Sequence, residues 1–152
     1  MSSPKKLLES LIPLYFVYLA GGVLKGRTRL QKLTFLTQMK LKGFVDYEFH
    51  KDIYGPCSYR LYSIVDNLVA MGLLNRETHR TASGNSVIHY RITRNGRSFV
   101  TFALEKRKIP KRLRLKTKKI FSDYGNASMI NLIKRIYTEY PEWTEKSIFF
   151  SH

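Results

Sequence analysis

The sequence is short of cysteine and of acidic residues. Its 152 residues include one cysteine, Cys57, which excludes an internal disulfide and a zinc site built from several cysteines. Only 11 residues are Asp or Glu, against 27 Lys and Arg, so the formal net charge is +16. A charge excess of this size indicates a polyanionic partner and says nothing about the fold.

The sequence also lacks a hydrophobic run long enough to cross a bilayer. The most apolar stretch, 11–24, contains Pro13 and Gly21-Gly22 and runs to about fourteen residues, where a bilayer needs roughly 20. Glu9 interrupts its approach and no small-x-small cleavage site follows, so it does not match a signal peptide. We interpret it as a buried first helix of a cytoplasmic protein, which would be nucleoid-associated if it binds DNA.

What the sequence has in quantity is apolar side chains and unevenly placed positive charge. Hydrophobic residues make up 43% and aromatic residues 13%, which excludes a disordered chain. Residues 58–119 hold fifteen basic and three acidic side chains, whereas residues 120–152 hold three and four. The positive field therefore belongs to the middle of the chain.

Hydrophobic periodicity and turn residues predict a mainly α fold with a small antiparallel β-wing. The predicted order is a helix from Pro4, a helix from Thr28, an extended stretch over 44–54 that Gly55-Pro56 breaks, a helix over 59–71, strands from 73 and over 87–92, and helices over 94–108, 111–121 and 127–140. Pro13 lies inside the first helix and is a candidate kink. In the second helix we place Arg29 and Lys32 off the apolar stripe, in water.

Two short patterns in the middle of the chain resemble known families. Leu68, Met71-Gly72-Leu73-Leu74, Tyr90-Arg91-Ile92-Thr93 and Gly96 resemble the recognition helix and wing of winged helix-turn-helix proteins of the MarR and PadR type. This resemblance implies a winged-helix domain over 1–108, followed by a C-terminal helical extension over 109–152. A weaker resemblance, to Panacea-type antitoxin domains, rests on Arg29-Leu30-Gln31-Lys32-Leu33, Tyr54-Gly55-Pro56 and Met71-Gly72-Leu73.

The winged-helix reading and the charge together predict double-stranded DNA binding by a transcriptional regulator. An α-helix fits the major groove, so we place helix 58–71 there and the wing, 75–91, on the backbone or in the minor groove. Arg60 can bond a guanine edge and Asn67 an adenine edge. The predicted contacts of the helices and the wing are Arg29, Lys32, Ser58, Tyr59, Arg60, Tyr62, Ser63, Asn67, Arg76, Arg80, Asn85 and Arg91.

A second basic unit follows the wing. Nine of the fourteen residues in 106–119 are basic and none of the remaining ones is an aspartate or glutamate. We expect Lys111, Arg112, Arg114, Lys118 and Lys119 to contact phosphates, which gives affinity without sequence specificity. The helix over 127–140 and the tail from Trp143 are neutral to slightly acidic and apolar, and we expect them to form a homodimer surface.

Other functions remain open at this point. The main alternative is an antitoxin-like or adaptor module that binds protein through its winged helix. A third is binding of RNA or single strands, with Phe44, Tyr47, Phe49 and Tyr54 as a stacking platform. An enzyme is not expected, because Cys57, His50 and Asp52 lie on an extended segment that does not by itself bring them together. No catalytic residue, metal site or cofactor is predicted.

Overall fold

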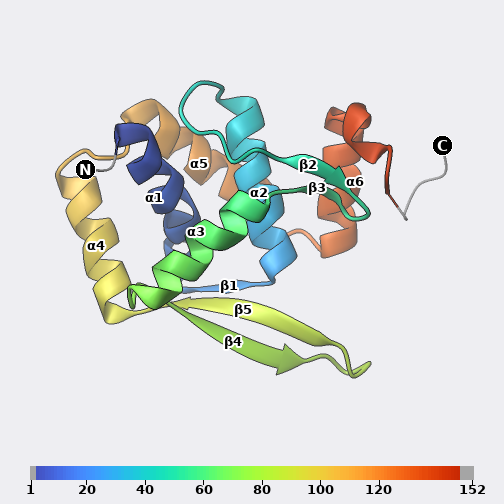
Figure 1. Ribbon diagram of the computed structural model, residues 1–152, viewed down its shortest axis with the longest axis horizontal. Coiled ribbons are helices and arrows are strands. Elements are labelled where there is room, and N and C mark those ends of the chain that lie inside the picture. Colours follow the sequence, from blue (N-terminus) through green and yellow to red (C-terminus); the bar gives the residue numbers. More distant parts are fainter. Residues whose placement is uncertain (1–2, 148–152) are drawn as a thin grey trace.

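The computed structural model describes residues 3–147 as six α-helices around a small sheet and a short hairpin (Figure 1). The elements are α1 (Pro4–Leu19), β1 (Val23–Lys25), α2 (Arg27–Lys40), β2 (His50–Asp52), β3 (Gly55–Cys57), α3 (Tyr59–Ala70), β4 (Leu74–Arg80), β5 (Ser86–Ile92), α4 (Arg94–Glu105), α5 (Lys111–Tyr124), α6 (Met129–Glu139) and the 3-10 helix η1 (Pro141–Thr144). No helix within 3–147 is long and apolar enough to cross a membrane.

Apart from the β2–β3 hairpin, the elements from α1 to α4 follow winged-helix order. β1 pairs antiparallel with β5, and β5 pairs with β4 along all seven residues, so the strand order is β1-β5-β4. The mainly α fold with a small antiparallel wing and a C-terminal helical extension is thereby confirmed. Residues 41–58, which include the β2–β3 hairpin, separate α2 from α3 where a helix-turn-helix usually has three or four residues.

Helix α1 runs through the middle of the core. Ser3 caps it by accepting a hydrogen bond from the Lys6 backbone N–H at 3.2 Å, and Pro4 occupies its first turn. Every residue from Leu8 to Val17 except Ser10 is buried, as expected for this stretch. Pro13 has no N–H to donate to the Glu9 carbonyl one turn earlier. The buried Tyr47 hydroxyl donates to that carbonyl instead, at 2.9 Å.

Local signals set the ends of α3 and α4. The Ser58 hydroxyl accepts from the Leu61 backbone N–H at 2.9 Å, and Gly72 ends α3 with a positive φ of 76°. Thr93 caps α4 by accepting from the Gly96 N–H. A β-carbon on Gly96 would lie 2.1 Å from the Leu73 carbonyl oxygen, so this turn of α4 needs glycine.

The extended stretch before α3 differs from the prediction. Residues 44–49 form neither helix nor strand, and β2 begins only at His50. Gly55-Pro56, predicted to break the segment, is instead part of β3, which pairs with β2. The left-handed φ of Gly55, 92°, lets the chain turn directly into the returning strand.

The C-terminal helices pack on the same core as the winged helix. Ile109, Leu113 and Ile120 from the α5 region, and Leu132 and Ile136 from α6, are buried with residues of α1 and α2. Beside them the Phe35 ring contacts Tyr140 and Trp143, at centroid distances of 5.5 and 4.9 Å. The apolar face that we expected to form a homodimer is therefore covered by the chain itself. Dimerisation remains a prediction, and a dimer would have to form through a different surface.

This packing predicts that α6 is needed for stability. Replacing Ile136, which is 0% exposed, by Ala should lower the free energy of unfolding by about 2–5 kcal/mol, because a cavity opens in the core. The matched change at Ile130, which is 45% exposed, should cost less than about 1 kcal/mol. Urea unfolding followed by circular dichroism measures both. Equal small losses at the two positions would show that α6 is not docked on the core.

Candidate nucleic-acid interface

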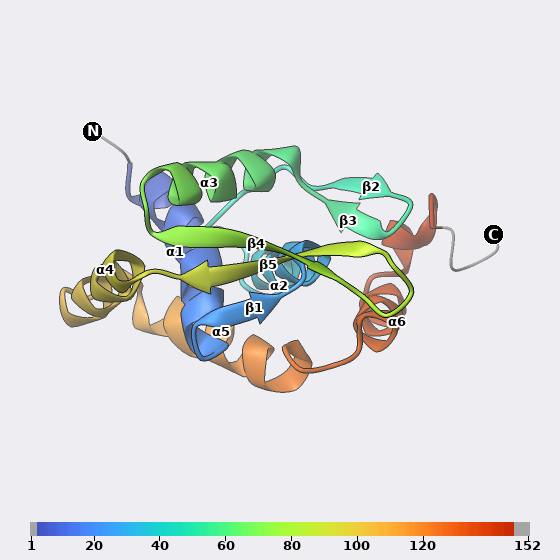
Figure 2. The ribbon, with the colours of Figure 1, turned by 90° about the horizontal axis from the view of Figure 1, so that it is seen from below.

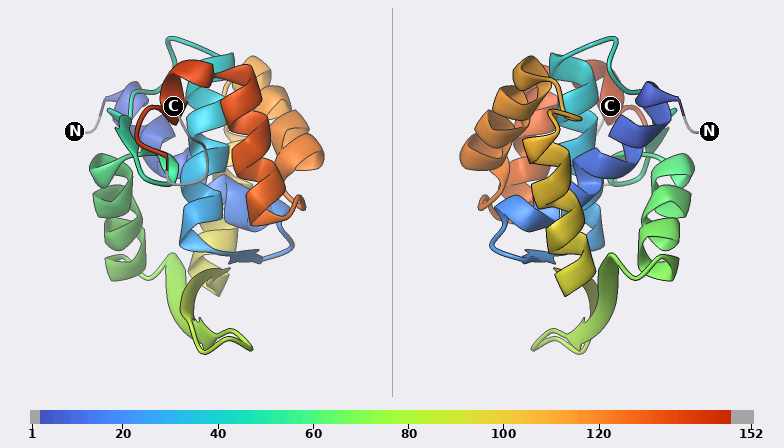
Figure 3. Two further views of the ribbon diagram at one scale, coloured as in Figure 1. Left: turned by 90° about the vertical axis from the view of Figure 1, so that its right-hand side faces the viewer. Right: turned by 90° about the vertical axis from the view of Figure 1, so that its left-hand side faces the viewer.

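The β4–β5 wing projects from the body of the molecule (Figures 1 and 3). Arg76, Arg80 and Arg91 on its strands are exposed. Arg76 pairs with Asp66 of α3, and Arg91 donates to Glu77 at 3.1 Å, which lowers the pKa of that carboxyl. Within residues 3–147, Arg80 has no carboxylate partner. It is the wing arginine whose charge is left for an external anion.

The outward face of α3 lies beside the wing. Tyr59, Ser63 and Asn67 are exposed on it, and Tyr59 is 67% exposed. Tyr62 is half-buried, with the Arg27 guanidinium 4.6 Å from the centre of its ring. The face thus offers hydroxyl and amide groups. Its one acidic residue, Asp66, is already paired with Arg76.

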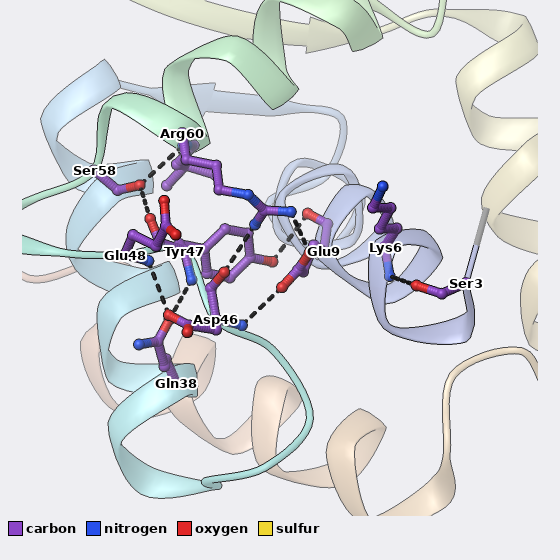
Figure 4. Close-up of polar contacts among 10 residues, drawn as sticks. Ser3, Lys6, Glu9, Gln38, Asp46, Tyr47, Glu48, Ser58 and Arg60 are labelled. Carbon is purple, nitrogen blue, oxygen red and sulfur yellow. Dashed lines mark hydrogen bonds and ion pairs between the residues drawn. The ribbon is translucent and has the colours of Figure 1, made fainter.

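Arg60, our predicted guanine reader, faces the protein (Figure 4). Its guanidinium donates to the Glu9 carboxylate at 2.6 Å and to the Asp46 carbonyl at 2.8 Å. The Glu9 side chain is 3% exposed, and its hydrogen bond raises the pKa of Arg60. Releasing Arg60 to a base edge would leave a buried carboxylate without its counter-charge. The arginine is therefore tied to the fold.

In three further predicted contacts, the polar groups are hydrogen-bonded within the protein. Ser58 is 0% exposed, and its hydroxyl donates to the Tyr47 carbonyl while capping α3. Lys32 is 2% exposed and donates to the Pro56 carbonyl at 2.8 Å, and burial lowers its pKa to about 8. Arg29 donates to the carbonyls of Gly125 and Ala127 at 3.0 and 2.6 Å. The prediction that Arg29 and Lys32 lie in water is wrong, because later segments cover that side of α2.

The basic segment lies on the other flank of the molecule. In Figures 2 and 3, α3 and α5 lie on opposite sides of α1 and α2, and both contact α1. Lys111, Arg112, Lys118 and Lys119 are exposed, and Lys119 pairs with Asp123. Arg114 is half-buried and lines, with Tyr15 and Tyr18, a cavity of about 720 Å³. The two groups of cations therefore lie on opposite flanks of the molecule.

The aromatic residues of 44–54 do not form an open stacking platform. Tyr47 is 0% exposed, and Phe44 and Phe49 are half-buried. The Phe49 ring contacts Phe35 edge-on, with centroids 5.3 Å apart. Of the four, Tyr54 alone is exposed. The observation that would favour RNA or single-strand binding is therefore missing from this stretch.

One cluster was missed from the sequence. His50, Asp52 and Cys57 come together on the β2–β3 hairpin, although we expected an extended segment to keep them apart. Residues i and i+2 of a strand share a face, so His50 and Asp52 were already on one side. The Ile53-Tyr54 connection joins the two strands and places Cys57 opposite His50. A turn predicted there would have put all three residues on one face.

Comparison with known proteins finds similar solved structures, but no family model and no curated protein matches this chain. The chain is similar to a crystal structure of a putative transcriptional regulator from Thermoplasma acidophilum, at 19% identity and a TM-score of 0.43. The alignment covers 81% of this chain and 98% of that one.

The geometry of Arg60 predicts a loss of stability on its removal. Arg60→Ala should cost about 2–4 kcal/mol of unfolding free energy, because the buried Glu9 carboxylate loses its partner. In the double variant Glu9→Gln, Arg60→Ala, part of that loss should be recovered, since no charge is left buried. A double-mutant cycle by urea unfolding measures the coupling, with the exposed Arg112→Ala as control. Strictly additive losses would show that the pair is not coupled.

Proposed function

We propose that this protein binds double-stranded DNA through its wing and the outward face of α3, and acts as a transcriptional regulator. The observation that carries the proposal is the projecting hairpin with Arg80 free of any carboxylate partner among residues 3–147, next to an exposed helix face. A helix of this kind fits the major groove, and basic residues on a hairpin suit the phosphates or the minor groove.

We propose a DNA contact for each side chain according to its chemistry and its exposure to solvent. Asn67 is the remaining candidate for base reading, because an amide bonds adenine at two atoms and Arg60 is occupied. Tyr59 and Ser63 are hydroxyl donors for phosphates at the start and middle of α3. Arg80 and Asn85, at and beyond the end of β4, would contact the backbone. Arg76 and Arg91 would contribute once phosphates compete with Asp66 and Glu77.

The cations of α5 form a second surface for phosphates. Because α3 and α5 lie on opposite flanks, one short duplex seated on α3 and the wing would not reach them. We assign Lys111, Arg112, Lys118 and Lys119 to contacts with longer DNA, or with a second duplex, that add affinity for any sequence. Arg114 is half-buried and lines the cavity beside Tyr15 together with Lys111 and Lys118, so its guanidinium is less open to DNA than the exposed cations.

The wing and α3 should behave differently when altered. Arg80→Gln should weaken binding to all duplexes alike and lower the salt slope by about one unit, because one phosphate contact is lost. Asn67→Ala should lose about 1–3 kcal/mol on the preferred site and relax the preference at one position. Fluorescence anisotropy on sites selected from random duplexes measures both.

The exposed Lys42, beyond the end of α2, supplies the matched control for these two variants. Lys42→Gln removes one positive charge as Arg80→Gln does, but at the end of α2 remote from the wing (Figure 1). Its affinity should stay close to that of the parent. An equal loss at Lys42 and Arg80 would mean that only net charge matters. Absence of saturable duplex binding at physiological salt would favour a protein partner on the α3 face.

The division into two surfaces predicts a dependence on DNA length. Changing Lys111, Arg112, Lys118 and Lys119 to Gln should hardly alter binding to a duplex of about 12 base pairs, roughly 40 Å long. Binding to a duplex of about 40 base pairs should weaken, and the loss should shrink at high salt. Titrations of both lengths at two salt concentrations test this. Equal losses for both lengths would place α5 on the same DNA-binding face as α3.

A further inference from the structure

The β2–β3 hairpin gathers three side chains of different chemistry on one face. His50 pairs with Cys57 across the hairpin, and Asp52 pairs with Gly55. Directly opposite residues and residues two apart on one strand point to the same side of a hairpin. The nitrogen, carboxylate oxygen and sulfur atoms of His50, Asp52 and Cys57 accordingly all lie within 4.8 Å of one another.

One atom of this cluster lacks the partner that its burial calls for. The Nε2 atom of His50 is buried and makes no hydrogen bond, and the Asp52 carboxylate oxygen lies 3.6 Å from it, beyond bonding distance. An unsatisfied buried nitrogen is costly and rare in folded proteins. The imidazole is also held in place, since its ring stacks on Tyr59 with centroids 4.5 Å apart. A fixed imidazole whose Nε2 atom makes no hydrogen bond is suited to a metal ion.

We propose that His50, Asp52 and Cys57 bind a divalent zinc ion, with water in the fourth position. Imidazole, carboxylate and thiolate are the three ligand types that zinc takes in proteins, and three protein ligands leave a tetrahedral site open to solvent. A sulfur ligand disfavours calcium and magnesium, which prefer oxygen. The site is distinct from the wing and from α5, and it borders the α3 face through the stacking of His50 on Tyr59. None of its three ligands is among the proposed DNA contacts.

The nearby positive charge of Lys32 is compatible with the ion. Lys32 lines a small cavity with Asp52 and Cys57, and its ammonium is held by the Pro56 carbonyl at 2.8 Å. Binding releases the thiol proton of Cys57, so the thiolate and the carboxylate together offset the two charges of zinc. Lys32 then faces a neutral group, and the repulsion it would exert on a bare dication is largely removed.

Cobalt is the probe for this site, because a cobalt–thiolate bond absorbs light and the chain has one cysteine. Titrating the untagged, reduced full-length protein with Co²⁺ should produce a sulfur-to-cobalt charge-transfer band that saturates at one ion per chain. Zn²⁺ should displace the cobalt and abolish the band. Failure of the parent protein to give the band would overturn the proposal, whatever the outcome of the DNA titrations.

Variants test whether all three residues are ligands. Cys57→Ser should remove the band, and His50→Gln and Asp52→Asn should each weaken zinc affinity by at least about tenfold, measured by competition with a chelating dye. His89→Gln, which removes a half-buried histidine on the wing, is the matched control and should bind as the parent does. Circular dichroism verifies that each variant is folded. Parental affinity in both His50→Gln and Asp52→Asn would mean that the thiol alone captures the metal, and would overturn the site.

Discussion

Glu9 is buried among the apolar residues of α1, so its carboxylate needs hydrogen-bond partners within the protein. Its two oxygens accept from Arg60 of α3 and from the Asp46 backbone N–H, at 2.6 and 2.8 Å. Its backbone carbonyl, left without a donor by Pro13, accepts from Tyr47. One residue of α1 thus holds both the segment before the hairpin and the first turn of α3 in place (Figure 4).

The sequence predicts those parts of the fold that depend only on residues close together in the chain. Helix caps act on backbone groups only a few positions away. The roles of Ser58, Gly72 and Thr93 at the ends of helices therefore follow from local chemistry. The same holds for the wing, whose two strands are joined by a turn of small polar residues.

The roles of the basic residues could not be predicted because they depend on distant segments. The carbonyls that accept from Arg29 lie almost a hundred positions later, and the Glu9 carboxylate lies 51 positions before Arg60. An apolar stripe on one helix indicates one buried face. It does not show that α5, α6 and residues 41–58 will cover the others, which is why Lys32 was not expected in the interior. Counting charges along the chain likewise could not separate the flank of α5 from that of α3.

Gln31 lies on a helix, yet its side chain hydrogen-bonds the extended backbone of Ser58 as a neighbouring strand would. Few side chains can do this. Its amide oxygen accepts from the Ser58 N–H at 2.8 Å while its amide nitrogen donates to the Ser58 carbonyl at 2.9 Å, as a neighbouring peptide would. Glutamate has the same shape but cannot donate when ionised, and asparagine is one carbon shorter. Among the twenty side chains, glutamine alone combines that reach with both polarities, so any substitution at position 31 leaves at least one of the two Ser58 backbone groups without its partner.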